Sequence, residues 1–221
     1  MRIVYLIDYN CPYSYIGLKR LRNAVEDLNL EVEWEMRSFE LEPFAGKRPT
    51  LTTTENYVKK YEISQEEASK RIEEIESTAN EDGLKINYKD MLLVSSKDAL
   101  RLTKYAQSKY PELTLKLVEE IFESNLVRNE NIRNTNVLTN IAISCGIEES
   151  EALKIIDNNY YNIEIELDKE EALTNGITST PYFILFIREE RLIIPGVFTE
   201  EEFKNALKDL ISGEIKNKSF I

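Results

Sequence analysis

One cysteine stands at a point in the chain where a reactive thiol is expected. Cys11 begins the segment Cys11-Pro12-Tyr13-Ser14, which follows a short apolar run and opens an amphipathic stretch. Proline is favoured at the first position of a helix, because its missing N–H is not needed there. Cys11 is therefore expected at a helix N-terminus, where unpaired backbone N–H groups and the helix dipole stabilise a thiolate. At such positions the pKa of a thiol can fall well below the free value of about 8.5.

Two polar side chains near this cysteine are candidates for a part in its chemistry. Ser14 lies three residues after Cys11 on the same helix face, so its hydroxyl can donate a hydrogen bond to the sulfur. Asp8 is either a buried carboxylate that exchanges protons with the thiol or a simple strand-end residue, and both alternatives stay open. For Cys11 itself the alternative is a buried structural cysteine. Its position before Pro12 makes that hypothesis the weaker one.

The complete absence of histidine excludes several kinds of active site. No Ser-His-Asp or Cys-His relay and no zinc site with histidine ligands can form. The only other cysteine, Cys145, ends an apolar helical segment just before its expected cap, Gly146, so we expect it to be a packing residue. Two cysteines are also too few for a disulfide framework.

Composition and charge narrow the partners and the compartment. The chain has 221 residues, of which 42% are hydrophobic and 31% are charged, as is typical of a soluble globular protein. Its formal charge of −12 disfavours nucleic acid, because phosphate binding relies on clustered Lys and Arg. No stretch approaches the ~20 apolar residues of a membrane span, and the N-terminus lacks the pattern of a signal peptide. We therefore expect a cytoplasmic protein without a stable disulfide and without nucleic-acid or membrane partners.

Hydrophobic periodicity predicts strands near both ends of the chain. Residues 3–7 form a short apolar run typical of a buried strand, residues 12–28 repeat apolar side chains at helical spacing, and residues 32–36 alternate. A helix that connects two such strands makes them parallel. After Gly176, residues 182–187 and 192–194 are rich in β-formers and predict an antiparallel hairpin.

The middle of the chain is predicted to be helical. Ser64 to Glu67 form a capping box before a charged helix, and Thr199 to Glu202 form another before the last helix of the chain. Ser95 opens a further helix, and residues 113–126 and 137–145 supply two more. Several consecutive helices with apolar faces predict a small helical bundle.

This order of elements predicts an α/β fold, with a thioredoxin-like core (β-α-β … β-β-α) and an inserted all-helical domain. Residues 1–48 and 162–221 would form the core, and residues 49–161 the insertion. The insertion would cover the site at Cys11. Three aromatic residues, Phe39, Phe44 and Tyr57, are candidates for the lining of a substrate groove, although scattered aromatics are more often core residues.

The Thr180-Pro181 pair gains meaning from this fold. Proline at the first residue of a strand is tolerated without any function. In a thioredoxin-like core, however, this loop faces the helix N-terminus that carries Cys11. A cis proline there would direct the Thr180 backbone at a substrate that lies beside the thiol.

Several short motifs occur in the order found in one known family. They are Cys11-Pro12-Tyr13-Ser14, Tyr15-Ile16-Gly17, Phe39-Glu40-Leu41-Glu42-Pro43, Ser96-Lys97-Asp98-Ala99-Leu100-Arg101-Leu102, and Gly176-Ile177 before Thr180-Pro181. With this order, nearly the whole chain resembles the DsbA family of thiol–disulfide oxidoreductases, and most closely its cytoplasmic FrnE-like branch. The resemblance implies Cys11 as the nucleophile, assisted by Ser14, without a metal or a tightly bound cofactor. It also implies the substrate contacts Pro12, Tyr13, Thr180 and Pro181.

One departure from the family's pattern changes the expected chemistry. The family carries C-x-x-C, and this chain has Ser14 in place of the second cysteine. A serine hydroxyl cannot resolve a mixed disulfide, so the resemblance implies monothiol exchange in which an external thiol, such as glutathione as co-substrate, releases the product. The substrate would be a thiol or disulfide, either protein or small molecule, and a homodimer is compatible with this function.

Two other functions stay open. Kappa-class glutathione transferases and 2-hydroxychromene-2-carboxylate isomerases have the same topology and resemble S-P-Y-S-Y at this place, which Pro12-Tyr13-Ser14-Tyr15 fits. Cys11 in place of the first serine argues against that alternative, because a protein thiol would compete with the thiol of glutathione. The third alternative is a non-catalytic binding module, or a chaperone-like one, that uses the same cleft.

Overall fold

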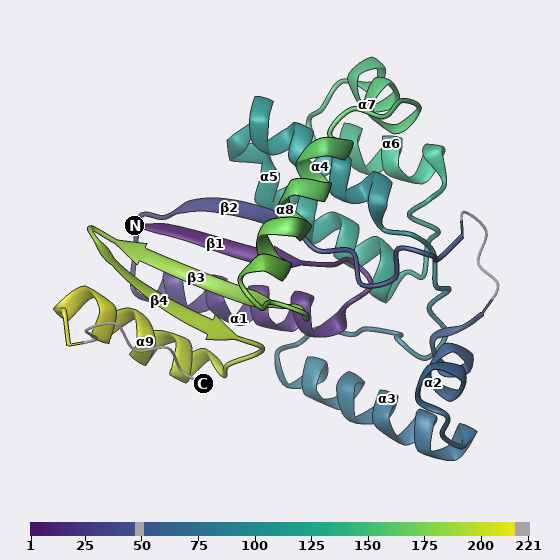
Figure 1. Cartoon of the computed structure of the whole chain (residues 1–221), viewed down its shortest axis with the longest axis horizontal. Helices are drawn as coiled ribbons and strands as arrows, with labels where there is room; N and C mark the ends of the chain where they lie inside the picture. The colour runs from purple at the N-terminus through teal and green to yellow at the C-terminus, as the bar shows by residue number, and fades with distance from the viewer. Residues whose placement is uncertain (47–50, 215–221) are drawn as a thin grey trace.

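A four-stranded sheet forms the centre of the computed structural model, which describes residues 1–46 and 51–214 (Figure 1). The strands are β1 (Arg2–Ile7), β2 (Glu33–Ser38), β3 (Tyr182–Ile187) and β4 (Glu190–Pro195), in the order β2-β1-β3-β4. β1 pairs parallel with β2 and antiparallel with β3, and β3 pairs antiparallel with β4. The predicted parallel pair and the predicted hairpin are therefore confirmed.

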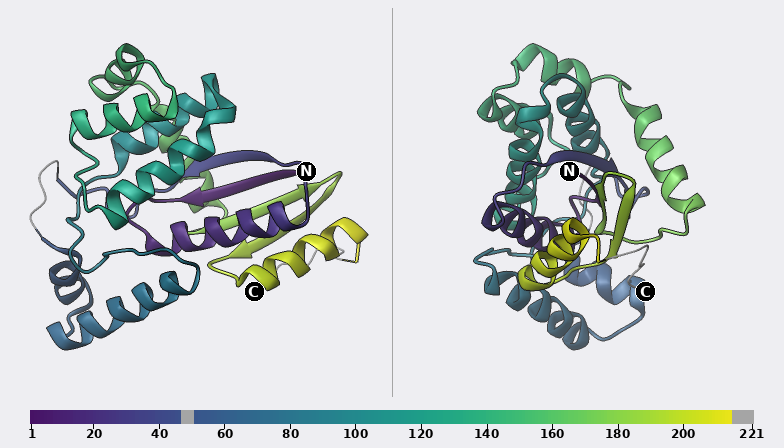
Figure 2. Two further views of the ribbon diagram at one scale, coloured as in Figure 1. Left: turned by 180° about the vertical axis from the view of Figure 1, so that it is seen from behind. Right: turned by 90° about the vertical axis from the view of Figure 1, so that its left-hand side faces the viewer.

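Helices cover both faces of this sheet. On one face, α1 (Pro12–Asp27) and α9 (Glu200–Ser212) lie side by side and pack against each other (Figure 2). They bury apolar side chains that point inward from the strands, such as Ile3, Tyr5 and Phe183. On the other face, α8 (Asn162–Thr174) crosses the sheet and packs against β2.

The sequence patterns did not predict α8, and its side chains give the reason. Ile165 and Ala172 point toward the protein and are buried, whereas Ile163 and Leu167 lie on the outer side and are exposed. With apolar residues on opposite sides, the helix has no single apolar stripe, and stripe periodicity is the pattern from which a surface helix is predicted.

The remaining helices form two groups on either side of α1 (Figures 1 and 2). A pair of helices, α2 and α3, lies at one end, and α3 contacts α1. A second group, α4 to α7, packs together and contacts β2 through α4. Their bounds are α2 (Thr53–Tyr61), α3 (Gln65–Glu81), α4 (Lys97–Lys109), α5 (Pro111–Phe122), α6 (Thr135–Cys145) and α7 (Glu149–Ile156), with a π-helical turn (Glu123–Val127) after α5. No helix within residues 1–46 and 51–214 is long and apolar enough to span a bilayer.

The expected domain boundaries stay predictions. The boundary between residues 48 and 49 lies outside the described residues. The boundary after residue 161 falls at the start of α8, Asn162, and α8 contacts both β2 and α4.

The predicted helix caps show how local sequence fixed several helix ends. The reciprocal capping box of Thr199 is present, and Gly146 ends α6 with a φ of 101°, so both predictions are confirmed. Ser64 accepts the N–H of Glu67, as an N-cap should, but the returning bond is absent because the Glu67 carboxylate pairs with Arg71. That box is therefore only half formed.

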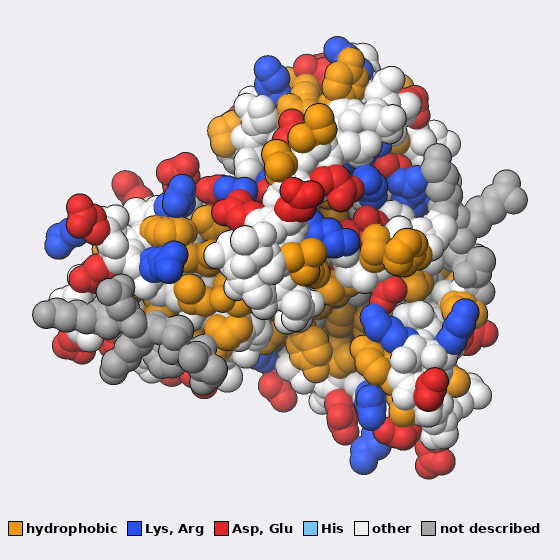
Figure 3. Space-filling model, in the orientation of Figure 1, with side chains coloured by type: hydrophobic (Ala, Val, Ile, Leu, Met, Phe, Trp, Pro, Cys, Tyr) orange, Lys and Arg blue, Asp and Glu red, His pale blue; other side chains and the backbone are white. Residues whose placement is uncertain are grey.

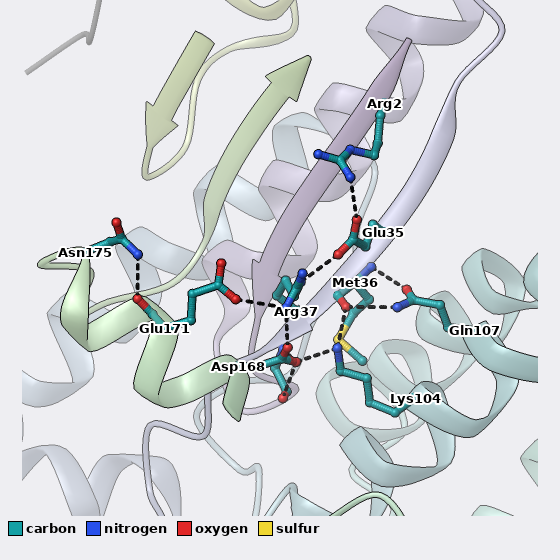
Figure 4. Close-up of polar contacts among 10 residues, drawn as sticks. Arg2, Glu35, Met36, Arg37, Lys104, Gln107, Asp168, Glu171 and Asn175 are labelled. Atoms are coloured by element: carbon teal, nitrogen blue, oxygen red, sulfur yellow. Dashed lines mark hydrogen bonds and ion pairs between the residues drawn. The ribbon is translucent and has the colours of Figure 1, made fainter. Parts of the chain in front are cut away.

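A buried polar cluster holds the end of β2 against α4 and α8 (Figure 4). Asp168 accepts hydrogen bonds from the N–H and the hydroxyl of Ser38, at 2.8 and 2.9 Å. The same carboxylate lies 2.5 Å from Lys104 and 3.0 Å from Arg37. Burial lowers the pKa of Lys104, and the ion pair with Asp168 opposes that shift. Each charge is thus paired within the protein.

Candidate active site

Cys11 lies at the N-terminus of α1, as the sequence predicts. Helix α1 begins at Pro12, and Cys11 is its N-cap, with extended backbone. The turn is closed by the N–H of Cys11, which donates to the carbonyl of Asp8, and the N–H of Ser14, which donates to the carbonyl of Cys11, both at 3.0 Å. The end of β1 thus leads directly into the helix that presents the thiol.

The structure brings this cysteine against the Thr180-Pro181 loop. The thiol of Cys11 donates a hydrogen bond to the carbonyl oxygen of Thr180 at 3.4 Å, across 169 positions of sequence. The Thr180-Pro181 peptide bond is cis. Gly17, six residues after Cys11 in α1, allows the helix to approach this loop and β3 closely, since a Cβ there would lie 3.1 Å from the Phe183 ring and 3.3 Å from Pro181.

Burial dominates the acidity of the Cys11 thiol. Only 6% of the residue is exposed, and desolvation of the thiolate raises the pKa of Cys11 above its ordinary value. The hydroxyls of Thr180 and Ser14 lower the pKa in part, and the charge of Asp8 raises it further. The prediction of a lowered pKa for Cys11 is therefore wrong. A helix N-terminus lowers the pKa of a thiol effectively only where the sulfur is not buried, and here the surrounding chain buries it.

Two buried hydroxyls next to the sulfur are left without a complete hydrogen bond. Ser14 is fully buried in the first turn of α1. Its hydroxyl has no hydrogen-bond partner of normal geometry, but it lies close enough to the Cys11 sulfur to lower the pKa of that thiol. The hydroxyl of Thr180 is in the same situation. Buried groups of this kind cost about 1–3 kcal/mol each. Both can donate to a thiolate when the sulfur loses its proton.

Asp8 is a buried carboxylate that directly follows the end of β1. Its oxygens accept the N–H groups of Asn10, at 3.1 Å, and Leu41, at 2.7 Å. Burial raises the pKa of Asp8 to about 6 in spite of these bonds. Among the hydrogen bonds of the described residues, none joins this carboxylate to the sulfur of Cys11. A second buried carboxylate, Glu40, lies nearby and is bonded to Ser95 at 2.5 Å.

A small cavity of about 220 Å³ opens beside Cys11, between the active-site turn and α2. Tyrosine rings form much of its wall, and a Lys60–Glu42 ion pair of 2.5 Å closes one side. The aromatic lining residues are Tyr13, Tyr57, Tyr61 and Tyr88. Cys11 is thus accessible to a ligand of limited size from one direction.

The three aromatic residues expected in a groove have different positions. Tyr57 lines the cavity as predicted. Phe39 does not, since it packs with Val4 and Leu6 on the far face of the sheet, and Phe44 is 99% exposed. Sequence reasoning missed Lys60 and Tyr88, which carry no local motif and reach the cavity only through the fold.

Cys145 takes no part in this site. It is buried in α6 within the main core cluster, and both cysteines of the chain are free. Burial raises the pKa of its thiol. In the described part of the chain, no group of three or more Cys, Asp or Glu side chains is arranged to hold a metal ion.

Comparisons with solved structures place the fold among known proteins. A probable DsbA oxidoreductase from Streptomyces coelicolor is 26% identical, with a TM-score of 0.86 over 100% of this chain and 94% of that one. The cytosolic disulfide reductase DsbM from Pseudomonas aeruginosa, solved with GSH, gives a TM-score of 0.68 at 13% identity over 96% and 100% of the two chains. A 2-hydroxychromene-2-carboxylate isomerase also gives 0.68, at 12% identity over 98% and 100%. The similarities to DsbM and to the isomerase show the fold alone. That fold is equally compatible with disulfide reduction and with isomerisation.

The family itself is settled by sequence. Residues 2–208 match the model of the DSBA-like thioredoxin domain, which covers nearly the whole chain. The match includes Cys11, the N-cap of α1, and Pro181, the residue directly before β3. This chain is accordingly a member of the DSBA-like thioredoxin domain family.

Proposed function

We propose that this protein is a monothiol oxidoreductase that exchanges thiols and disulfides through Cys11. The observation that carries the proposal is the contact of 3.4 Å between the Cys11 sulfur and the Thr180 carbonyl, made across a helix N-terminus and a cis-proline loop. A substrate sulfur bonded to Cys11 would lie beside the Thr180 backbone, which can orient it. Pro12, Tyr13 and Pro181 would be the remaining substrate contacts.

The exchange needs two steps and two different thiols. In the first, the sulfur of Cys11 attacks one sulfur of a substrate disulfide, the S–S bond of the substrate breaks, and the leaving thiolate takes up the proton that Cys11 has lost. In the second, an external thiol attacks the mixed disulfide, releases the bound group as a new disulfide and returns the proton to Cys11. Glutathione belongs to the class of small thiols that can do this. A reducing cytoplasm would supply it.

Ser14 acts in this scheme as a donor and not as a nucleophile. Its hydroxyl and that of Thr180 lack complete hydrogen bonds while the sulfur is protonated. Once the thiolate forms, both can donate to it, and a charge-assisted hydrogen bond is about twice as strong as a neutral one. The pair therefore compensates for part of the desolvation that raises the pKa of Cys11.

The size and lining of the cavity favour a small disulfide, or a single side chain of a larger one, over a broad protein surface. About 220 Å³ is less than the usual volume of a site for a drug-sized ligand, ~300–1,000 Å³. Tyr57 and Tyr88 line the cavity with aromatic rings, and Lys60 lies beside them in its ion pair with Glu42.

Glutathionylation tests the proposal directly. We expect oxidised glutathione to add one glutathionyl group to the reduced protein, as measured by intact mass spectrometry, and a reduced thiol to remove it. Cys11→Ser should abolish the adduct and Cys145→Ser should leave it unchanged. Ser14→Cys should form the adduct only transiently, because the new thiol resolves it into an internal disulfide.

Several results would count against this function. If the adduct forms equally on Cys145, or on neither cysteine, Cys11 is not a reactive thiol. If Cys11→Ser instead improves an activity that uses reduced glutathione as cofactor, the isomerase or transferase alternative gains support. Ligand binding that is unaffected by Cys11→Ser, with no exchange in any variant, would indicate a binding module.

A further inference from the structure

A second hollow lies on the opposite face of the sheet from α1 and α9. It has a volume of about 380 Å³ and is bounded by the outer face of the strands and by one side of α8. Figure 3 shows hydrophobic side chains gathered over the strands on this face, with basic side chains among them. None of its lining residues belongs to the cavity at Cys11. We call it the sheet-face hollow.

The floor of the sheet-face hollow is apolar and follows from the strand register. Val4 lies opposite Ile184, and Ile184 lies opposite Ile193, so these three side chains form one row across three strands. Leu6 and Tyr182 form the next row. Solvent-facing positions of an antiparallel strand are usually polar, yet β3 and β4 carry half-buried apolar residues here. The floor is therefore suited to contact with apolar groups.

Two arginines stand at one end of this floor. Arg2 and Arg191 lie opposite Phe186 from the strands on either side of it, and the Arg2 guanidinium is 4.4 Å from the centre of the Phe186 ring. Neighbouring strands are ~4.8 Å apart, so these two residues are separated by about 10 Å at the backbone and their long side chains can meet above the ring. The side chain of Arg191 has no ion pair or hydrogen bond within residues 1–46 and 51–214, whereas that of Arg2 has a long contact of 3.5 Å with Glu35.

The charges at the other end are already balanced. Arg37 is bonded to Glu35, Asp168 and Glu171, as Figure 4 shows, and Lys104 pairs with Asp168 from the protein side. The lining as a whole carries three arginines and three carboxylates, but the carboxylates all lie away from Arg191, whose side chain is left unpaired at the Phe186 end. In a chain with a formal charge of −12, this local unpaired cation points to an anion as the ligand.

We propose that the sheet-face hollow binds an apolar monocarboxylate, a ligand with one carboxylate on an aliphatic or aromatic body. The carboxylate would lie between Arg2 and Arg191 above Phe186, where guanidinium groups can bind it by paired hydrogen bonds. The apolar body would lie along the Ile184 row toward Tyr182. The volume of the hollow lies within the usual range for small-molecule sites, ~300–1,000 Å³.

Calorimetric titration of the full chain with decanoate tests this proposal. We expect one binding site, about tenfold weaker binding for Arg191→Gln and no measurable binding for Ile184→Glu. Arg188→Gln is the matched control, because Arg188 is an exposed arginine at the adjoining β3–β4 turn that does not line the hollow. Decanol, which keeps the tail and lacks the charge, should bind at least tenfold more weakly. 1-Naphthoate in place of decanoate distinguishes an aromatic from an aliphatic ligand.

Several outcomes would overturn the proposal. They are no binding of either acid, equal binding of decanoate and decanol, or equal losses in Arg191→Gln and Arg188→Gln. Binding that survives Ile184→Glu and is lost in Tyr57→Ala would assign the ligand to the cavity at Cys11 instead. If Ile184→Glu shows a lower melting temperature in circular dichroism, Ile193→Ser replaces it in the same test. Glutathionylation of Cys11 is measured on the same samples, so a failure here is separable from a failure of the proposed exchange.

Discussion

At the scale of single residues, the chemistry of Cys11 is set by what buries it. The sulfur has the expected place at a helix N-terminus, next to two hydroxyls that can donate to it. Desolvation nevertheless raises the pKa of the thiol, and the buried charge of Asp8 adds to that effect. The raised pKa favours a protonated thiol at rest, and in the proposed exchange the two hydroxyls would donate to the thiolate as it forms.

Asp8 gives a prediction about stability and pH. Its pKa is raised from 3.8 to about 6 in the folded chain, so between these values the folded protein binds more protons than the unfolded one. Stability supplied by this group is present at low pH and is lost as pH rises from about 4 through about 6. Over that window we expect the free energy of unfolding of the wild type to fall by about 3 kcal/mol relative to Asp8→Asn, from a shift of roughly two pKa units. Urea titrations of both proteins at pH 4, 5, 6 and 7 measure it, and parallel pH profiles would contradict it.

The residue patterns were sufficient to locate the thiol but not its environment. Cys11, Ser14 and Thr180-Pro181 carry local features, a proline at a helix start and a proline before a strand, that depend on sequence neighbours only. The raised pKa of Cys11 and the tyrosine-lined cavity depend on segments far away in the chain. No local pattern indicates how deeply a sulfur will be buried.

At the scale of elements, the buried Asp168 cluster gives the sharpest prediction. Asp168→Ala would leave Lys104 as a buried charge without its carboxylate and remove the acceptor of the Ser38 N–H. Losing one partner of such a pair costs about 3–5 kcal/mol. We expect that loss in urea unfolding followed by fluorescence of Trp34, the only tryptophan of the chain.

The same helix supplies the control for this variant. Glu166 pairs with Lys97 at the surface, and Glu166→Ala should cost less than about 1 kcal/mol. Equal losses in the two variants would show that the cluster does not anchor α8.

Helix α8 is also the element that sequence patterns failed to predict, because Ile163 and Leu167 make both of its sides apolar. Asp168, which joins α8 to Arg37 and Lys104, is a residue whose pairing cannot be inferred from spacing.

At the scale of the whole molecule, the helices inserted between the two halves of the sheet hold the active-site turn as well as cover it. Asn125, in the π-helical turn after α5, donates to the carbonyl of Tyr9 at 2.9 Å and to the Asn10 side chain at 3.2 Å. Asn10 in turn donates to the carbonyl of Val94 at 2.8 Å. Two distant segments therefore fix the residues that precede Cys11, and π-helical turns of this kind are frequent at functional sites.

Asn125→Ala should consequently change both stability and reactivity. The substitution leaves the buried Tyr9 carbonyl without this donor, so we expect a loss of about 1–3 kcal/mol in free energy of unfolding. Because the substitution loosens the turn, we expect the Cys11 sulfur to become more exposed. The pH at which iodoacetamide alkylates Cys11, measured in a Cys145→Ser background, should then shift downward. Asn23→Ala, which removes the hydrogen bond from the Asn23 side-chain amide in α1 to the Glu200 carboxylate in α9, far along the helix from Cys11, should leave that profile unchanged. An unchanged profile in Asn125→Ala would mean that the inserted helices cover the thiol without positioning it.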